Sequence, residues 1–410
     1  MVERLSISTT AEQAIIQHIL SSEQQRIPFA DFMEMALYHP QFGYYATGDR
    51  TLGAHGDFVT SPHMGRDFGE LIGAQFADIW EALGRPKPFD IVEMGAGQGL
   101  VAADAIAYLH THHPDCFTHL SYTIIEKSAR LRAEQQTRLS TWADKGADKG
   151  VSLSWETLES LPDNSLTGCL FSNELVDAFP VHWVEQHGQQ LQEMWVAATD
   201  QGLAPKLGEL STPELATYFE KVGIDLNADY PDGYRTEINL TALDWIAQVA
   251  QKIARGYLIT IDYGYTAQRY YSPARKEGTL QCYYRHSYHN DPFIHIGEQD
   301  ITAHVDFTAL EVQGQTAGLK TIGYTQQALF LMALGLSDRL SALSQPSTEA
   351  TPDQPATAQT IRAIMQRRET LQQLISPMGL GSFGVLIQAK GLSQKEIARP
   401  LKGLAIPPMF

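Results

Sequence analysis

The segment FSNELVDAFP, residues 171–180, places polar side chains directly after a run of apolar ones. Asn173 and Glu174 stand where a buried strand is expected to end, and Asp177 follows three positions later. In open α/β folds, ligands bind at the carboxyl ends of the strands, so these three residues are candidate catalytic residues. Glu174 could hold a cationic group of a substrate, with Asp177 as support or proton acceptor. The alternative is structural, with Glu174 or Asn173 capping a helix and Asp177 as a surface acid.

The segment DIVEMGAGQGLVAAD, residues 90–104, combines an expected strand with a glycine-rich turn and the start of a helix. Glycine permits a positive φ and lets the backbone approach a ligand closely. The spacing G-x-G-x-G departs from the dinucleotide fingerprint G-x-G-x-x-G, and an acid before the first glycine would repel a phosphate. S-adenosylmethionine, with an ammonium, a sulfonium and ribose hydroxyls, fits better. The residues expected to bind it here are Glu93, Gly95, Ala96, Gly97 and Gly99.

Two further strand ends extend this expected cofactor site. The segment YTIIEK places Glu126 after the second strand, where a carboxylate can accept both ribose hydroxyls. Trp155 and Glu156 follow the third strand and could flank an adenine ring. Together with the glycine turn, these positions make a stronger signal than the turn alone.

The segment GDFVTSP predicts a rigid turn with exposed backbone donors and adjacent hydroxyl groups. We expect Thr60, Ser61 and Pro62 to fold over the cofactor and Asp57 to contact the substrate. The alternative is a loop that caps the following helix through Thr60 or Ser61.

Two later segments offer residues for the wall of a substrate pocket. IDYGY ends an expected fifth strand with Asp262 and Tyr263, and ITAHVDF brings His304 and Asp306 to the same face of a strand. Each pair could equally be a structural hydrogen-bonding pair.

Histidines crowd the segment HTHHPDCFTH, residues 110–119, which includes His110, His112, His113, Cys116 and His119. The spacing matches no zinc motif, so we expect no metal site. The three cysteines of the chain lie far apart and form no C-x-x-C motif, so the sequence predicts neither a disulfide framework nor a zinc site. This pattern fits a reducing compartment.

Composition limits the class of protein. Hydrophobic residues make up 43% of the 410 residues and charged residues 19%, as in an ordinary globular protein. The net charge of −17 argues against nucleic acid or anionic lipid and favours a basic protein or a cationic side chain, although acidity also keeps proteins apart. The N-terminal residues form no continuous apolar run, and no stretch reaches the roughly 20 apolar residues of a membrane span. We therefore expect a cytoplasmic protein.

Short apolar runs alternate with helical or loop-rich stretches, which predicts a doubly wound, mostly parallel sheet with both faces covered. Helical spacing predicts two helices within residues 11–37, joined near Pro28, and a third helix from Gly65 onward. The expected strands are FDIVEMG, SYTIIEK, VSLSW, GCLFSNE, GYLITIDYG, KTIGYTQ and FGVLIQAK.

The spacing of these elements predicts how the chain is divided. Residues 1–86 should form a helical and loop extension that contributes to the cofactor and substrate site, and 87–410 the main domain. Insertions at about 195–240 and 266–320 are too long for simple loops and are expected over the sheet edge. Residues 341–359 are rich in Pro, Ser, Thr and Gln, which predicts a mobile surface loop.

Seven motifs appear in order over most of the chain: FMEMALYHPQFGYYA, GDFVTSP, FGELIGAQ, VEMGAGQGLVAAD, SNELVDAFPV, IDYG and GEQDITAHVDF. They resemble the MidA-type family of S-adenosylmethionine-dependent methyltransferases, whose mitochondrial members are protein arginine methyltransferases needed for respiratory complex I assembly. The resemblance implies an α/β, Rossmann-like class I methyltransferase core of seven mostly parallel strands, with an N-terminal helical extension and insertions. It implies S-adenosyl-L-methionine as cofactor, S-adenosyl-L-homocysteine as product, and Asn173 and Glu174 facing the methyl donor and acceptor.

The resemblance also implies a protein substrate, with a respiratory-complex subunit as one candidate. Two departures from the pattern matter. No obvious mitochondrial presequence is present, which fits a bacterial member, with the mitochondrial matrix as the alternative if a presequence is missing from this chain. The pair of glutamates on one hairpin that well-studied arginine methyltransferases use is absent, so arginine as acceptor follows from the resemblance alone.

Other functions stay open. The long insertions could enclose a small-molecule acceptor, and the chain could be an assembly or scaffold protein with a vestigial methyl-donor site. A dinucleotide-dependent oxidoreductase is disfavoured by Glu93 and by the glycine spacing.

Overall fold

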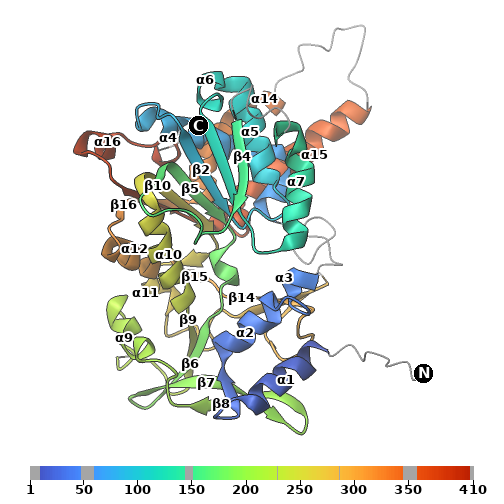
Figure 1. Ribbon diagram of the computed structural model, residues 1–410, viewed down its shortest axis with the longest axis vertical. Coiled ribbons are helices and arrows are strands. Elements are labelled where there is room, and N and C mark those ends of the chain that lie inside the picture. The colour runs from blue at the N-terminus through green and yellow to red at the C-terminus, as the bar shows by residue number, and fades with distance from the viewer. Residues whose placement is uncertain are drawn as a thin grey trace.

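The computed structural model forms two lobes, one built on a large, mostly parallel sheet and one on a smaller antiparallel sheet (Figure 1). Asp57, expected to contact the substrate, lies outside the described residues. The structure describes residues 10–47, 60–143, 151–228, 230–285, 287–344 and 358–406.

Seven strands form the main sheet in the order β16-β17-β10-β5-β2-β3-β4. β17 is antiparallel to both of its neighbours, and the other neighbouring pairs are parallel. This arrangement confirms the expected Rossmann-like fold with a mostly parallel seven-stranded sheet. The strands are β2 (Phe89–Met94), β3 (Leu120–Ile125), β4 (Val151–Glu156), β5 (Leu166–Asn173), β10 (Ile253–Asp262), β16 (Lys320–Gln326) and β17 (Gly384–Lys390).

Helices cover both faces of the main sheet. Ile91 and Phe171 pack on the face of α4, α5 and α7, whereas Val92 and Leu170 pack on the face of α10 and α12. Successive residues of a strand point to opposite faces, so a sheet covered on both sides needs continuous apolar runs. The helices are α4 (Arg66–Ala82), α5 (Leu100–His112), α7 (Ala129–Ala143), α10 (Leu240–Lys252) and α12 (Phe307–Thr316).

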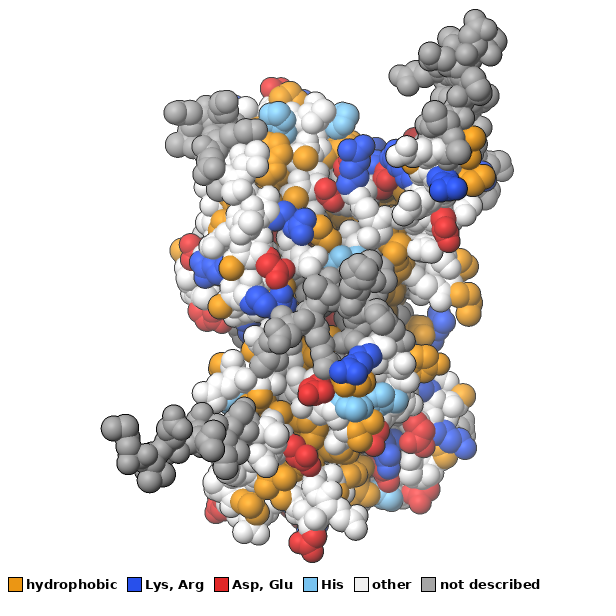
Figure 2. Space-filling model, turned by 90° about the vertical axis from the view of Figure 1, so that its right-hand side faces the viewer, with side chains coloured by type: hydrophobic (Ala, Val, Ile, Leu, Met, Phe, Trp, Pro, Cys, Tyr) orange, Lys and Arg blue, Asp and Glu red, His pale blue; other side chains and the backbone are white. Residues whose placement is uncertain are grey.

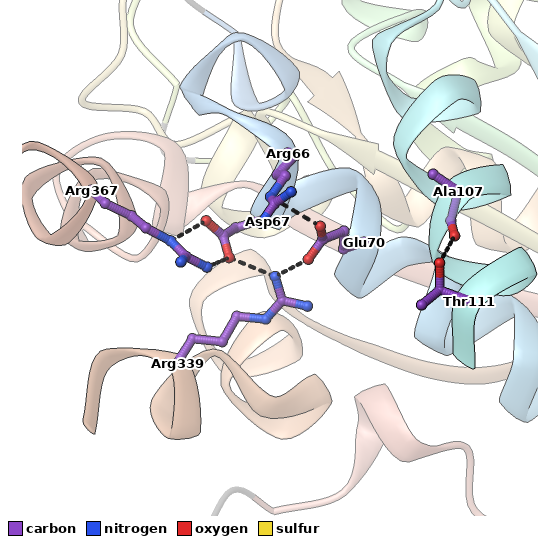
Figure 3. A network of polar contacts seen from close by, with 7 residues as sticks. All are labelled: Arg66, Asp67, Glu70, Ala107, Thr111, Arg339 and Arg367. Atoms are coloured by element: carbon purple, nitrogen blue, oxygen red, sulfur yellow. Dashed lines mark hydrogen bonds and ion pairs between the residues drawn. The ribbon is translucent and has the colours of Figure 1, made fainter. Parts of the chain in front are cut away.

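An ion-pair network joins the C-terminal helices α14 (Ser337–Ser344) and α15 (Ala358–Leu374) to the start of α4 (Figure 3). Arg339 contacts Asp67 at 2.5 Å and Glu70 at 2.6 Å, and Arg367 contacts Asp67 at 2.7 Å. Burial alone would raise the pKa of Asp67, yet hydrogen bonds from the two arginines lower it. The carboxylate therefore stays ionised and holds both helices.

The expected mobile loop at about 341–359 overlaps the ends of two helices. α14 continues to Ser344 and α15 already begins at Ala358, and the residues between them lie outside the described part of the chain. The polar composition of these ends suits exposed helical turns as well as a loop, so composition alone could not place the boundaries.

The second sheet has the order β1-β7-β6-β9, with β8 paired to β7. Its strand β1 comes from the N-terminal segment and pairs with β7, through Ile27 opposite Val196. Helices α1 and α2 pack on the same lobe, which favours a division of the chain by sheet rather than at residue 86. The elements are β1 (Arg26–Pro28), β6 (His182–His187), β7 (Gln190–Thr199), β8 (Gly202–Gly208), β9 (Tyr234–Ile238), α1 (Ala11–Ser21), α2 (Phe29–Tyr38) and α9 (Pro213–Lys221).

The insertions differ from the expected bounds and place. The first begins with β6 at His182 rather than near 195, and it forms a lobe beyond the carboxyl ends of the main strands instead of lying over the sheet edge (Figure 1). The second contributes small sheets, but its last part is α12, which covers the main sheet. The small strands are β11 (Gly264–Tyr265), β12 (Gln281–Tyr284), β13 (Ser287–His289), β14 (Asp300–Thr302) and β15 (Val305–Asp306).

Figure 2 shows one face of the molecule, on which basic and acidic side chains are interspersed over both lobes. In the described ranges, no helix combines the length and the apolar character needed to cross a membrane.

Candidate active site

A cavity of about 450 Å³ opens at the carboxyl ends of the neighbouring strands β2, β3 and β5. Its wall combines the glycine turn after β2, the residues after β3 and the polar end of β5. The turn of η1 (Ser61–Met64) and tyrosines from the N-terminal segment also contribute. The predicted site residues that line this cofactor cavity are Thr60, Pro62, Glu93, Gly95, Ala96, Gly97, Glu126, Asn173, Glu174 and Asp177.

The backbone conformation and surroundings of Gly95 and Gly97 explain why this turn uses glycine. Gly95 has a φ of 68°, and a β-carbon there would lie 2.8 Å from the Leu175 side chain. Gly97 has a φ of 52°, and a β-carbon there would meet no described protein atom within 4 Å. Backbone at Gly97 therefore faces open space in the cavity, where a ligand can approach it closely. Gly99, at the start of α5, is outside the cavity wall.

Two buried acids line the cofactor cavity. Glu93 accepts a hydrogen bond of 2.6 Å from the Tyr122 hydroxyl, and burial raises its pKa to about 7. Glu126 accepts bonds from the Ser128 amide at 2.8 Å and from Gln135 Nε2 at 3.2 Å. Burial raises the pKa of Glu126 as well. Two acids in one wall suit a ligand that carries hydroxyl and ammonium donors rather than phosphates.

Trp155 and Glu156 do not line the cofactor cavity, contrary to the expectation that they flank an adenine ring. The Trp155 indole donates to Gln135 Oε1 at 3.1 Å, and Glu156 is exposed and accepts from Ser160 at 2.9 Å. Gln135 also donates to the Gly97 carbonyl at 2.8 Å. Trp155 therefore supports the glycine turn through Gln135, a link that sequence reasoning missed because α7 approaches the turn only in the fold.

Tyrosines of the N-terminal segment line the cofactor cavity and were not predicted as site residues. Tyr38 donates to the Ala178 carbonyl at 2.8 Å, and Tyr45 donates to Asp300 at 2.9 Å. Their rings stack with centroids 5.4 Å apart. The tyrosine-rich run YHPQFGYYA is the sequence signal that could have drawn attention to them.

The turn after Thr60 connects the cofactor cavity to Glu174. Thr60 bonds to His63 and makes no capping bond, so the capping alternative is not what this turn does. Ser61 is buried, with its amide 3.3 Å from Glu174 Oε1 and its hydroxyl 3.1 Å from Gln327. Its amide thus donates directly to the principal candidate carboxylate.

Glu174 adopts a φ of 51°, a left-handed conformation that costs a residue with a β-carbon roughly 1–2 kcal/mol. Its carboxylate accepts from Asn173 Nδ2 at 3.0 Å in addition to the Ser61 amide. Burial raises the pKa of Glu174 to about 8, and the nearby Asp177 acts in the same direction. Strain and a raised pKa at one residue are typical of functional positions.

Asp262 has a structural role instead of the expected place in a substrate-pocket wall. It is fully buried at the end of β10, and its Oδ2 accepts from the amides of Leu175, Val176 and Asp177 at 2.9 to 3.3 Å. Asp262 thus holds the turn after β5, and Glu174 is free of the capping role that the sequence left open.

Asp306 is likewise a structural residue rather than a pocket residue. It caps α12 by accepting from the amides of Thr308 at 3.0 Å and Ala309 at 3.2 Å, and it bonds to Tyr218. β15 ends and α12 begins at this position, so the sequence alone did not show whether Asp306 belongs to a strand or caps a helix.

A second cavity, of about 290 Å³, shares Glu174 with the first. Tyr263 and His304, both predicted, line it. Its remaining wall was not predicted and comes from segments distant in sequence. These residues are Gly264, Tyr265, Tyr283, Thr302, Met378, Gly379, Ser382 and Phe383.

The histidine-rich segment has packing roles. His110 packs against Phe117 and Trp142, and Cys116 is buried. Within the described residues, no group of three or more His, Cys, Asp and Glu side chains could hold a metal ion.

The cofactor cavity fits S-adenosylmethionine. Gly97 leaves backbone open to a ligand, and Glu126 offers carboxylate oxygens to hydroxyl groups. Asn173 Oδ1 is buried and has no hydrogen-bond partner among the described residues, so it is ready to accept from an ammonium or hydroxyl group. S-adenosylmethionine, the ligand inferred from the sequence, carries the ammonium and hydroxyl donors that these acceptors require.

Relatives of known description agree with this fit. A family model described as "Putative S-adenosyl-L-methionine-dependent methyltransferase" matches residues 71–325. The mitochondrial protein arginine methyltransferase NDUFAF7 of Mus musculus is 30% identical over 347 residues, which cover 80% of this chain and 75% of the relative. The Homo sapiens protein of the same name is 30% identical over 344 residues, which cover 79% and 73%.

A solved structure extends the agreement to three dimensions. The crystal structure of a Burkholderia thailandensis protein bound to S-adenosyl-homocysteine has a TM-score of 0.82 and 30% sequence identity to this chain, and the match covers 97% of this chain and 95% of that one. The family match runs from α4 to β16 and includes the glycine turn, Glu126 and the polar end of β5. The chain belongs to the family of S-adenosyl-L-methionine-dependent methyltransferases.

Proposed function

We propose that this methyltransferase acts on arginine side chains of a partner protein and that Glu174 orients the guanidinium. The observation that carries the proposal is that Glu174 lines both the cofactor cavity and the second cavity. A group bound in the second cavity would therefore meet the cofactor cavity at a carboxylate. The names of the relatives, protein arginine methyltransferase, support this acceptor.

The chemistry assigns a clear task to the carboxylate. When bound, the cofactor supplies a methyl group activated by its sulfonium sulfur. A guanidinium is a poor nucleophile because its lone pairs are delocalised, and a carboxylate that binds two of its N–H groups fixes its plane and leaves a third nitrogen free. That nitrogen forms the new N–C bond, the electrons of the broken S–C bond stay on sulfur, and one N–H proton leaves. The pKa of Glu174 is about 8 in the free protein, and binding of the cation favours its ionised form, which accepts and then releases this proton.

Asp177 lies close enough to the same carboxylate to raise its pKa. It is buried, burial raises its pKa to about 6, and it bonds to the Tyr263 hydroxyl. Asp177 and Asp262 place negative charge next to Glu174, which favours a cation in front of the three acids. We propose Asp177 as a positioning residue rather than the proton acceptor.

We also propose that the N-terminal segment contributes to the cofactor and substrate site. Tyr38 and Tyr45 line the cofactor cavity together with Thr60 and Pro62. For the partner, a respiratory-complex subunit is the first protein to test, which rests on the family resemblance. The cytoplasm is the compartment that we propose, which rests on the sparse, unpaired cysteines of the chain, although the named relatives are mitochondrial.

The experiment is transfer of labelled methyl groups. The purified protein is incubated with labelled S-adenosylmethionine and a cell lysate, and the labelled products are resolved by size and hydrolysed to amino acids. We expect label in protein and in methylated arginine. Label only in small molecules would favour a small-molecule acceptor, and binding of S-adenosylhomocysteine without any transfer would favour a scaffold protein.

A variant pair assigns the role of Glu174. Glu174→Gln keeps the shape and removes the charge, so we expect transfer to fall by at least about 100-fold while affinity for S-adenosylhomocysteine changes only a few-fold. Glu23→Gln, at an exposed position of the other lobe, is the matched control. Transfer at the wild-type rate in Glu174→Gln would remove this residue from the reaction.

A further inference from the structure

The second cavity has mainly aromatic walls. Tyr263 packs against His304 with centroids 5.1 Å apart and against Phe383 at 5.5 Å. The ring of Tyr265 also lies 5.1 Å from that of His304, and Tyr283 lines the same cavity. Flat aromatic faces favour a planar or cationic group over a bulky aliphatic one.

Tyrosine in this region already attracts guanidinium groups. Arg269 and Arg275 lie 4.3 and 4.7 Å from the centroid of Tyr265. Arginine stacks on aromatic rings more readily than the compact, strongly hydrated ammonium of lysine. Arg269 and Arg275 already occupy the Tyr265 ring, so a bound planar cation would stack on other rings of the wall, such as Tyr263 and Phe383, with Glu174 in the same wall to balance its charge.

Two polar groups in the wall can accept hydrogen bonds from such a cation. One is the carboxylate of Glu174. The other is His304, whose Nδ1 is buried and has no hydrogen-bond partner among the described residues. The His304 backbone amide donates to the Thr279 hydroxyl at 3.1 Å, and its ring packs against Tyr263 and Tyr265, which limit its rotation.

The charge state of His304 suits an acceptor. Burial lowers its pKa to about 4, and the charge of Arg275 acts in the same direction. The imidazole is therefore neutral near pH 7, and in the tautomer with the proton on Nε2 its Nδ1 carries a free lone pair. A buried acceptor without a partner is costly unless a ligand supplies a donor.

The cavity is open to a side chain from outside. Met378, in its wall, is 95% exposed. A volume of about 290 Å³ is at the lower end of the range for ligand pockets, roughly 300–1,000 Å³, which fits one extended side chain.

We propose that the second cavity binds the guanidinium of the acceptor arginine, with His304 Nδ1 accepting one of its N–H groups and Glu174 accepting others. This inference rests on the proposed function and adds a second substrate-binding residue. It also gives the specificity: the aromatic wall favours a planar guanidinium, which stacks on rings, over the compact, strongly hydrated ammonium of lysine.

The first test measures binding without catalysis. Protein saturated with S-adenosylhomocysteine is titrated calorimetrically at pH 7.5 with Nα-acetyl-arginine amide, and with the citrulline and lysine analogues as comparisons. We expect the arginine analogue to bind more tightly than the lysine analogue, and the neutral citrulline analogue to bind least. Absence of any preference for the arginine analogue would overturn the inference.

The second test changes His304. His304→Phe keeps a flat ring without the acceptor, so we expect arginine-analogue affinity to fall roughly 10- to 100-fold with unchanged S-adenosylhomocysteine affinity. His304→Gln restores an acceptor oxygen and should recover much of the loss. His18→Phe, at an exposed position of α1, is the matched control. Wild-type affinity in His304→Phe would overturn the inference even if Glu174→Gln abolishes transfer.

These outcomes separate the two proposals. If the wild-type protein transfers no methyl group to protein arginine, the proposed function fails, whatever the calorimetry gives. If transfer to arginine occurs but His304→Phe raises neither the KM for a peptide acceptor nor the dissociation constant, only the role of His304 fails. A rise in KM with little change in kcat is the signature that a purely structural role would not produce.

Discussion

The raised pKa of Glu174 predicts that Glu174→Gln stabilises the protein while it abolishes methyl transfer. A carboxyl group with a higher pKa in the folded than in the unfolded state binds its proton more tightly when folded. Its contribution to the free energy of unfolding is therefore complete below the ordinary pKa of 4.5 and is lost as the pH rises through about 8. Glutamine does not titrate and keeps its contribution at all of these pH values.

The magnitude follows from the same numbers. The rise of the pKa from 4.5 to about 8 corresponds to at most about 5 kcal/mol, at 1.36 kcal/mol per pH unit. Glu174 is partly open to two cavities that admit water, so we reduce this figure to roughly 2 kcal/mol at pH 9. The amide also relieves the repulsion with Asp177 and Asp262, which is part of the same figure.

The assay is thermal or urea unfolding of both proteins at pH 5, 7 and 9, followed by tryptophan fluorescence. The difference in the free energy of unfolding between variant and wild type should be small at pH 5 and grow in favour of the variant up to pH 9. Glu23→Gln should show no such trend. A difference that is independent of pH, or a variant that is less stable than the wild type at pH 9, would refute the reasoning.

Three further predictions use other contacts. Gly97→Val adds a branched side chain where the backbone faces the cofactor cavity, so calorimetry should show at least about 100-fold weaker binding of S-adenosylhomocysteine. Gln327→Leu removes the acceptor of the Ser61 hydroxyl, at 3.1 Å, and the donor to the Leu374 carbonyl, at 3.2 Å, and should lower kcat about 10-fold in the methyl-transfer assay with cofactor affinity preserved. Asp67→Asn removes the partner of two arginines and should lower the unfolding free energy by roughly 2 kcal/mol at pH 7. Because the pKa of Asp67 is lowered, that loss should shrink as the pH of the unfolding experiment falls below about 4.

The fold and the cofactor cavity could be predicted because their signals are local in sequence. Continuous apolar runs such as the one that contains Ile91 and Val92 identify buried parallel strands, and the glycines before α5 identify a ligand turn. The carboxyl ends of parallel strands meet at one edge of a sheet, so the sequence alone predicts that Glu93, Glu126 and Asn173 lie close together, and all three line the cofactor cavity.

What could not be predicted depends on contacts between distant segments. Asp262 and Glu174 both follow apolar strands and look alike in sequence, but only the pairing of β10 with β5 shows that Asp262 holds the turn. Trp155 follows a strand as Glu126 does, yet the approach of Gln135 from α7 directs its indole away from the cofactor cavity. In the second cavity, Tyr263 follows a strand and was predicted, but Phe383 and Met378 come from a distant segment that gives no local signal.

Three acids lie together near the ends of β5 and β10. Glu174, Asp177 and Asp262 lie close enough to influence one another's pKa, and burial raises all three. A fold selected for stability alone would avoid this repulsion and would place glycine at the left-handed position of Glu174. Both costs fall when a cation binds in front of the acids, because it favours their ionised forms. The repulsion is therefore best explained as preparation for a cationic acceptor, and proton release on binding of the arginine analogue, measured in buffers of different ionisation enthalpy, should accompany its entry into the second cavity.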